Sequence, residues 1–258
     1  MTTPTNSSTR VEGEIAFGVD IGGSGIKGAP VDLTTGELAL PRVKIKTPRP
    51  ATPHAVVEVI TQVIQSFDLP PGTPIGIAYP GVIYGGVTAT AANLDKSFIG
   101  TDLVRLVEQA TDRRIHLAND ADAAGFAEVQ YGAARGVGGT VLVMTLGTGI
   151  GSALISEGNL VPNTELGHLE IDGYDAEKRA ASSARDREDL SWRKWAGRLQ
   201  RYFTVVDDLL HPDLFVVGGG VSREHEKFLP LLNLRPPIIP AMLRNTAGIV
   251  GVAALAAR

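Results

Sequence analysis

The segment IAFGVDIGGSGIK, residues 15–27, joins an apolar run to a cluster of glycines. Ile15 to Val19 predicts a buried strand that ends at Asp20, and the turn Gly22-Gly23-Ser24-Gly25 follows it. Ile26 to Pro30 predicts the returning strand. Because glycine lacks a Cβ and tolerates positive φ, the backbone N–H groups of such a turn can wrap a phosphate. We therefore interpret this hairpin as a candidate phosphate loop.

The same pattern recurs at residues 140–151, which read TVLVMTLGTGIG. Thr140 to Leu146 predicts a buried strand, Gly147-Thr148-Gly149 a second candidate phosphate turn, and Ser152 to Ser156 the returning strand. The turn is not a P-loop, because the Lys-Ser/Thr ending is missing, and not a dinucleotide fingerprint, because a strand rather than a helix is expected after it. Two such units resemble the plan of the actin-like ATPase (ribonuclease H-like) fold, an α/β fold of two lobes with a ligand cleft between them.

The remaining elements follow from apolar periodicity and from breaker residues. The predicted helices span residues 54–67, 103–110, 192–210 and 247–257, and further strands span 43–47, 75–78, 115–117 and 214–217. We predict a disordered tail over 1–13, a smaller N-terminal lobe over 14–118 that the C-terminal helix 246–258 joins, and a larger C-terminal lobe over 119–245.

The composition of the 258-residue chain is that of a soluble globular protein, with a formal net charge of -4, 43% hydrophobic and 20% charged residues. The absence of cysteine excludes a disulfide framework and a zinc site built on thiolates. No apolar run reaches the roughly 18 residues of a membrane-spanning helix, and the first dozen residues have no signal-peptide core. We expect a cytoplasmic protein with no nucleic-acid or membrane partner.

Polar side chains flank the first glycine turn. Ser24 can donate a hydroxyl hydrogen bond to phosphate, and Lys27 can supply a point charge. Asp20 would repel phosphate, so we expect it to hold Mg²⁺, directly or through water. The alternative is a structural hairpin with a surface lysine, and the Asp and Lys on either side of the turn favour the phosphate site.

Asn119-Asp120-Ala121-Asp122 follows the predicted strand 115–117 and precedes an alanine-rich segment. A carboxylate in this position can cap a helix N-terminus, or it can be the general base that takes a proton from a sugar hydroxyl. The residue types support both roles equally. They also leave the choice between Asp120 and Asp122 open.

Glu165-Leu166-Gly167-His168 begins a segment rich in hydrogen-bonding side chains, with further acids at Glu170, Asp172, Asp175 and Glu177. Such a set suits a polyhydroxylated sugar. Zinc is the weaker alternative, because no second histidine follows at helical spacing. In the first half of the chain, Gly81 allows close backbone approach and Asn93 offers both a donor and an acceptor.

Six segments resemble, in order and spacing, the ROK family (repressors, open reading frames and kinases). They are Asp20 to Lys27, Asn93 to Gly100, Asn119-Asp120, Leu146 to Gly151, Glu165 to His168 and Val217 to Val221. Within the family, the short chain and the stretches NLDKSFIGTD (93–102) and ELGHLE (165–170) are similar to actinobacterial glucokinases and glucomannokinases that use polyphosphate.

The resemblance implies a magnesium-dependent, homodimeric glucokinase that transfers the terminal phosphoryl of polyphosphate, and of ATP, to the 6-hydroxyl of glucose, with mannose as a second acceptor. It implies that Asp120 is the base. The residues implied to hold the hexose are Gly81, Asn93, Asn119, Asp120, Glu165, His168 and Glu177. Those implied to hold the donor are Asp20, Gly22, Gly23, Ser24, Lys27, Gly147, Thr148 and Gly149, and Gly218, Gly219 and Gly220 would border the nucleoside.

Two alternatives stay open. The first is a ROK hexose kinase that uses only ATP, with which the glycines on the nucleoside side are equally consistent. The second is a sugar-sensing regulator, since ROK repressors bind sugar without phosphorylating it. ROK kinases commonly carry a cysteine-rich zinc motif, which this chain lacks, so no zinc is expected. No dense basic run marks a groove for polyphosphate, although basic residues distant in sequence could converge in space.

Overall fold

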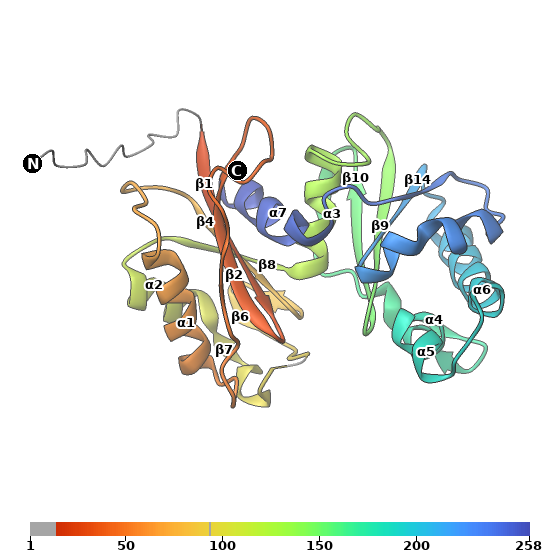
Figure 1. The fold of residues 1–258 in the computed structure, drawn as a ribbon, viewed down its shortest axis with the longest axis horizontal. Helices are drawn as coiled ribbons and strands as arrows, with labels where there is room; N and C mark the ends of the chain where they lie inside the picture. The colour runs from red at the N-terminus through yellow and green to blue at the C-terminus, as the bar shows by residue number, and fades with distance from the viewer. Residues whose placement is uncertain (1–13, 93) are drawn as a thin grey trace, which may run out of the picture.

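The computed structural model describes residues 14–92 and 94–258, and its fold is built on two five-stranded sheets (Figure 1). The predicted tail over 1–13 and the predicted sugar ligand Asn93 lie outside the described residues. Among the residues described, no helix combines the length and the apolar character needed to cross a membrane.

The first sheet has the strand order β3-β2-β1-β4-β8. β1 and β2 form an antiparallel hairpin through the predicted glycine turn, with Gly22 paired to Gly25. β4 runs parallel to β1 and β8 runs parallel to β4, so both strands end at the same edge of the sheet. The bounds are β1 Ile15–Gly22, β2 Gly25–Asp32, β3 Val43–Ile45, β4 Ile75–Tyr79 and β8 Ile115–Asn119.

The second sheet repeats this topology in the order β11-β10-β9-β14-β15. β9 and β10 form the second predicted hairpin, with Leu146 paired to Ile150, and β14 runs parallel to β9. The bounds are β9 Thr140–Leu146, β10 Ile150–Ser156, β11 Asn159–Val161, β14 Leu214–Gly218 and β15 Ile238–Pro240. The predicted repeat of strand, glycine turn and strand is confirmed, and both sheets extend it in the same way.

Helices cover the outer faces of the two sheets (Figure 1). α1 (Pro53–Gln65) and α2 (Leu103–Thr111) pack on the first sheet, and the apolar stripe of α1 closes one hydrophobic core. α6 (Trp192–Leu210) packs with α4 (Ala176–Ala180) over the second sheet, where Trp195 and Phe203 are fully buried. α5 (Ser182–Arg187) continues from α4.

Two helices lie between the sheets and pack against each other (Figure 1). α3 (Asp120–Gln130) contacts β9 and β10, whereas α7 (Ala247–Ala256) returns from the C-terminus to contact β1 and β4. The contact is close because a Cβ on Gly251 would lie 1.7 Å from the Ala123 carbonyl oxygen. The predicted boundaries of the two lobes stay a prediction, because α3 and α7 pack against each other between the two sheets and belong to both halves.

Short strands and turns complete the chain between these elements. β5 (Ile83–Tyr84), β6 (Val87–Thr88) and β7 (Thr101–Asp102) form a small antiparallel sheet beside the first lobe. β12 (Glu170–Ile171) and β13 (Tyr174–Asp175) pair beside the predicted sugar segment. Strands of two residues carry too little periodicity to be predicted from sequence.

Candidate active site

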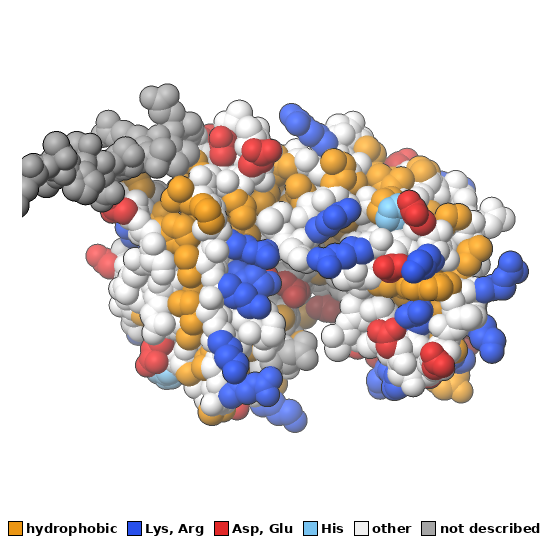
Figure 2. All heavy atoms as spheres, viewed as in Figure 1, with side chains coloured by type: hydrophobic (Ala, Val, Ile, Leu, Met, Phe, Trp, Pro, Cys, Tyr) orange, Lys and Arg blue, Asp and Glu red, His pale blue; other side chains and the backbone are white. Residues whose placement is uncertain are grey.

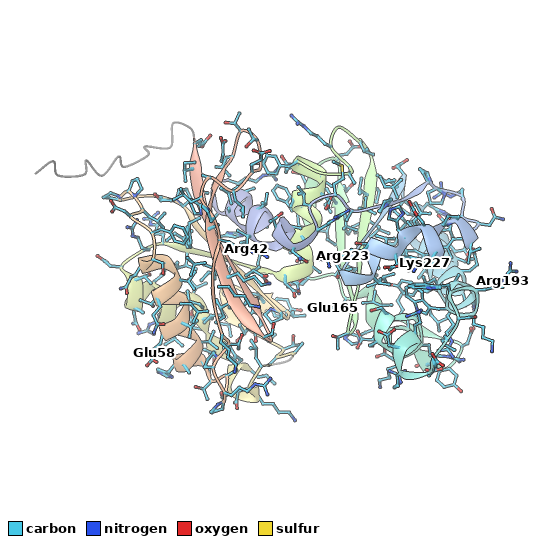
Figure 3. All side chains as sticks on the ribbon, viewed as in Figure 1. Arg42, Glu58, Glu165, Arg193, Arg223 and Lys227 are labelled. Carbon is cyan, nitrogen blue, oxygen red and sulfur yellow. The ribbon has the colours of Figure 1, made fainter. Side chains whose placement is uncertain are left out.

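A cavity of about 630 Å³ brings together predicted site residues from both halves of the chain. Figure 2 shows the hollow between the lobes, and Figure 3 shows Glu165 in that region. The predicted residues that line it are Gly81, Asn119, Asp120, Gly147, Thr148, Gly149, Glu165, His168, Glu177 and Gly219. The second glycine turn and the predicted sugar ligands therefore share one space.

A second cavity of about 290 Å³ adjoins the first and shares Asp120 with it. Asp20, Lys27 and Gly218 line this smaller space, together with Arg244. Asp120 therefore lies at the junction between a space lined by predicted sugar ligands and a space lined by predicted phosphate ligands.

The first turn of α3 orients Asp120. Asn119 is the N-cap, because its side-chain oxygen accepts hydrogen bonds from the backbone N–H groups of Ala121 (2.8 Å) and Asp122 (3.1 Å). The amide nitrogen of Asn119 donates to the Gly81 carbonyl at 3.1 Å and so connects the helix to the β4 loop. The interpretation of Asp120 as the helix cap is therefore wrong, since it is the first residue inside the helix.

Burial is the main cause that raises the pKa of Asp120 to about 6. The negative charge of Asp20 raises this pKa further, and that of Glu165 adds a smaller contribution, while the backbone N–H of Ala121 opposes the shift. A carboxylate with a pKa near the working pH is suited to accept a proton in a reaction. The same repulsion between Asp20 and Asp120 favours a cation between them.

Asp122, the competing carboxylate, lines neither of these two cavities. Its side chain is 1% exposed, and one oxygen accepts a hydrogen bond from the backbone N–H of Asn163 at 2.7 Å. Burial is the main cause that raises its pKa to about 7. The geometry thus distinguishes two carboxylates that the residue types alone left equivalent, and Asp120 is the one that the family resemblance implied.

Three side chains of the predicted sugar segment, His168, Asp175 and Glu177, lie close together, and Glu177 contacts the second glycine turn. Glu177 accepts a hydrogen bond from the Ile150 N–H at 3.1 Å, and a Cβ on Gly149 would lie 2.3 Å from the same carboxylate oxygen. His168 Nδ1 lies 3.0 Å from the Asp175 carboxylate, a contact that raises the histidine pKa. The absence of a side chain on Gly149 therefore lets the Glu177 carboxylate lie directly against the turn.

His168, Asp175 and Glu177 can bring one ligand atom each within 4.8 Å of one another. Within the described part of the chain, no other group of three or more such side chains does so. His168 and Glu177 already have protein hydrogen-bond partners, and both line the larger cavity with Glu165. Their placement favours hydrogen bonding to a ligand in that cavity.

The first glycine turn lies outside both cavities. Gly22, Gly23 and Ser24 form the tip of the β1–β2 hairpin, whereas Lys27, farther along β2, faces the smaller cavity. The Lys27 ammonium is 3.0 Å from the Asp20 carboxylate, so part of its charge is already matched.

The three glycines predicted to border the nucleoside do not all line a cavity. Gly218 and Gly219 line the smaller cavity, whereas the exposed Gly220 lies outside both. Gly219 has φ +83°, and a Cβ there would lie 2.2 Å from the Leu146 carbonyl oxygen. Only glycine fits at this position without strain.

Sequence reasoning missed several residues that line the cavities. The Thr90 hydroxyl accepts a hydrogen bond from the Val82 N–H at 2.9 Å, and the Thr90 carbonyl accepts one from the Tyr79 hydroxyl at 2.8 Å. These bonds fix the loop that contains Gly81. Arg244 lines the smaller cavity from a segment far along the chain. No motif surrounds Thr90 or Arg244, so only the fold reveals them.

Comparisons with known proteins identify relatives that match most of this chain. The model of the ROK family matches residues 16–185. The polyphosphate glucokinase of Mycobacterium tuberculosis is 50% identical over 238 residues, which cover 92% of this chain and 89% of that protein. A crystal structure of the inorganic polyphosphate/ATP-glucomannokinase from Arthrobacter sp. strain KM matches with a TM-score of 0.87 and 52% identity, covering 94% of this chain and 98% of that one.

A more distant structure, a ROK family glucokinase from Streptomyces griseus in complex with glucose and AMPPNP, has a TM-score of 0.75 at 23% identity and covers 93% of this chain and 98% of that one. At this identity the likeness concerns the fold alone, and it agrees with the predicted two-lobed actin-like architecture. The family match covers more than half of the chain, and the relatives at 50% identity or above cover nearly all of it. The chain belongs to the ROK family.

Proposed function

We propose that this protein is a glucokinase that transfers the terminal phosphoryl of inorganic polyphosphate, and of ATP, to the 6-hydroxyl of glucose, with mannose as a second acceptor. The names of the two relatives described above at 50% identity or more support this activity. The observation that carries the proposal is the position of Asp120, which faces both the sugar-side cavity and the phosphate-side cavity.

Asp120 acts as the general base. Its carboxylate takes the proton of the 6-hydroxyl as that oxygen forms a bond to the terminal phosphorus. The bridging bond to the rest of the donor breaks, and a polyphosphate shorter by one unit, or ADP, leaves. A pKa of about 6 keeps most of the carboxylate ionised at neutral pH, so the base is ready before substrate binds.

Glu165, His168 and Glu177 hold the sugar hydroxyls. They line the same cavity as Asp120 and combine acceptors with one group that can donate. Asn119 and Gly81 act together, because the bond between them fixes the cavity wall beside Asp120. We also retain Asn93 as a sugar ligand on the strength of the family resemblance.

The donor lies against the two glycine turns, with Lys27 on its charged end. Gly147, Thr148 and Gly149 line the larger cavity, where the backbone N–H of Gly147 donates to the Gly149 carbonyl and those of Thr148 and Gly149 would face the donor, and Gly218 with Gly219 would border a nucleoside. Mg²⁺ suits this place, since it prefers one or two carboxylates together with phosphate oxygens and Asp20 supplies a carboxylate beside Asp120. When bound, the ion would neutralise charge on the transferring phosphoryl.

The sharpest test is a glucose-phosphorylation assay with polyphosphate and with ATP side by side, with mannose as a second acceptor. We expect glucose 6-phosphate from both donors. Turnover with ATP alone would favour the ATP-only hexose kinase. Glucose binding by calorimetry without turnover from either donor would overturn the proposal in favour of a sugar-sensing regulator, a class that has no need for a base between two cavities.

Two further expectations come from the family resemblance, namely a cytoplasmic location and a homodimer. Light scattering coupled to size-exclusion chromatography measures the mass in solution. A mass of one chain, 27.2 kDa, would contradict the dimer.

A further inference from the structure

A strip of basic side chains runs along the edge of the first sheet and leads away from the phosphate-side cavity. Figure 2 shows a row of Lys and Arg on the wall of the N-terminal lobe that faces the hollow, on the side where Figure 3 labels Arg42. We define the basic strip as Arg42, Lys44 and Lys46, at β3 and its two flanking positions.

Strand register puts the strip beside Lys27. In the first sheet Asp20 pairs with Lys27, and Lys27 pairs with Lys44, so these three side chains form one row across β1, β2 and β3. Partners opposite each other in a sheet point to the same face. Because Lys27 faces the cavity that contains Asp120, Lys44 lies on the cavity face as well.

The side chain of Lys44 leans toward the first glycine turn. A Cβ on Gly25 would lie 2.4 Å from Lys44 Cε, so the lysine stem passes directly over this glycine. The turn itself lies outside the cavities, and Lys44 therefore connects Lys27 inside the cavity to the open hairpin tip.

Exposure alternates along this edge with the period of a strand. Arg42, Lys44 and Lys46 are exposed, whereas Val43 and Ile45 are half-buried. Alternate residues share a face, so neighbouring cations of the strip are about 7 Å apart along the strand. Among the residues described, no carboxylate lies within 4.0 Å of any of the three.

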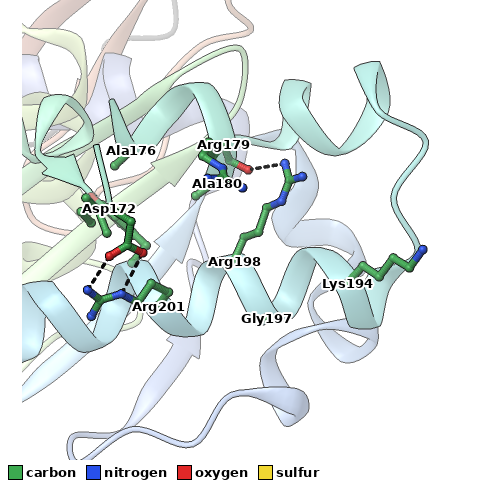
Figure 4. A pocket seen from close by; sticks show the side chains of 10 residues that line it. Asp172, Ala176, Arg179, Ala180, Lys194, Gly197, Arg198 and Arg201 are labelled. Carbon is green, nitrogen blue, oxygen red and sulfur yellow. Dashed lines mark hydrogen bonds and ion pairs between the residues drawn. The ribbon is translucent and has the colours of Figure 1, made fainter. Parts of the chain in front are cut away.

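The molecule has another basic surface that lacks these properties. In the pocket between α4 and α6, Arg201 makes two hydrogen bonds to the Asp172 carboxylate, at 3.1 and 2.8 Å, and Arg198 donates to the Arg179 carbonyl (Figure 4). Arg198 also pairs with Glu188. The charges of Arg198 and Arg201 are thus matched by carboxylates. Arg42 donates to the Asn245 carbonyl at 3.1 Å, but none of the three cations of the basic strip has a carboxylate partner among the described residues.

We propose that the basic strip binds the inorganic polyphosphate chain beyond its reacting end, with the terminal phosphate at Lys27 and the following phosphates over Lys44 and the first glycine turn toward Lys46. This inference rests on the proposed function and deepens it. A linear polyanion matches evenly spaced cations on a straight strand. Polyphosphate continues past the three phosphates that ATP offers, so we expect the outer cation, Lys46, to act on long-chain polyphosphate and not on ATP.

The test compares Lys46→Ala and Lys44→Ala/Lys46→Ala with the wild type, using long-chain polyphosphate, tripolyphosphate and ATP as donors. We expect the KM for long-chain polyphosphate to rise about 3- to 10-fold for Lys46→Ala and about 10- to 50-fold for the double variant. For Lys46→Ala, the KM for ATP and the kcat with either donor should change less than about 2-fold. The preference for long chains over tripolyphosphate should shrink in both variants.

Salt dependence gives an independent measure. Binding of a polyanion releases counterions, so the wild-type KM for long-chain polyphosphate should rise steeply with salt, and each lysine removed should lower the slope by roughly one unit. Lys194→Ala is the matched control, because it removes an exposed lysine on α6 in the other basic pocket (Figure 4). It should leave both the KM and the slope unchanged.

The outcomes separate the two proposals. An unchanged KM for polyphosphate in the double variant, with a wild type that uses polyphosphate, would overturn the basic strip and leave the glucokinase standing. An equal rise in the KM for polyphosphate and ATP in Lys46→Ala would also overturn it, because the strip would then act on every donor. A wild type that does not use polyphosphate would overturn the proposed function itself.

Lys44→Arg/Lys46→Arg should restore polyphosphate binding, which excludes misfolding as the cause.

Discussion

Two cavities of nearly equal volume, about 630 and 600 Å³, meet at Asn119 on the N-terminus of α3. Asp120 lines the first and Asp122 lines the second. The first is also lined by the second glycine turn and by Glu165, His168 and Glu177, whereas the second is lined by His116, Asn163 and Arg258. Volume alone therefore does not identify an active site, and the two aspartates differ in what surrounds them.

In the second cavity Asn163 links segments of the two lobes. Asn163 accepts a hydrogen bond from the Ile83 N–H at 3.1 Å and donates one to the Ile83 carbonyl at 2.9 Å. Its own N–H donates to Asp122. These contacts join β5 to α3 and to the segment after β11, so we infer a structural role for Asp122 and a chemical role for Asp120.

Asp120→Asn is the change with the largest expected effect. The amide keeps the shape of the side chain and loses the ability to take the proton, so kcat should fall about 100- to 10,000-fold, the usual contribution of a general base. Glucose affinity, measured by calorimetry, should change little. Activity close to the wild type would remove the functional difference between the two cavities.

Glu165→Gln tests the sugar side of the first cavity. The carboxylate would no longer offer a charged acceptor to a sugar hydroxyl, and a hydrogen bond to a charged group is worth about 1.5–3 kcal/mol. The KM for glucose should therefore rise about 10- to 100-fold, while the KM for the phosphoryl donor stays near the wild-type value. A selective rise in the donor KM would contradict the assignment of Glu165 to the sugar.

Asp122→Asn should have the smallest effect on activity, within about 3-fold in kcat, and a measurable effect on stability. Burial raises the folded-state pKa of Asp122 to about 7, above its usual value of 3.8. An acid with a raised pKa stabilises the fold at low pH relative to high pH, and this stability is lost as the pH rises from about 4 through 7. The neutral variant avoids that loss, so its free energy of unfolding at pH 7.5 should exceed that of the wild type by about 1–3 kcal/mol.

Thermal melting at pH 5 and at pH 7.5 checks this prediction. The advantage of Asp122→Asn should be clear at pH 7.5 and smaller at pH 5. An equal advantage at both pH values would mean that the effect does not come from the carboxylate charge. A large loss of turnover would instead assign Asp122 to the chemistry and reverse the comparison.

The sequence predicted the main elements because their signals are local. The three- and four-residue spacing predicted a helix over 54–67, observed as α1, and the predicted helix over 192–210 coincides with α6. Both glycine hairpins and the α/β fold class are confirmed as well. The small strands β5, β6 and β7 were missed because a pair of residues has no periodicity to detect.

Site residues were predictable where a motif surrounds them. Glu165, His168 and Glu177 lie within a dozen residues, and the structure brings them into one cavity with Asp120. The basic strip was not predicted, although Arg42, Lys44 and Lys46 alternate plainly in the sequence. Charged side chains are common on exposed edge strands, so the alternation alone does not indicate a binding site. The pairing of Lys44 with Lys27 in the sheet is what places these cations beside the phosphate-side cavity.

The sequence by itself determined that this chain folds as two α/β halves, each of which begins with a glycine-turn hairpin. These hairpins were predictable because glycine turns and apolar strands depend on residues that are adjacent in the chain. It also narrowed the catalytic carboxylate to Asp120 or Asp122. The family resemblance then implied Asp120, and the tertiary structure added a physical difference, because the two side chains leave the same helical turn and line different cavities. Which cavity each one enters depends on segments more than 40 residues away in the chain, such as Asn163 for Asp122.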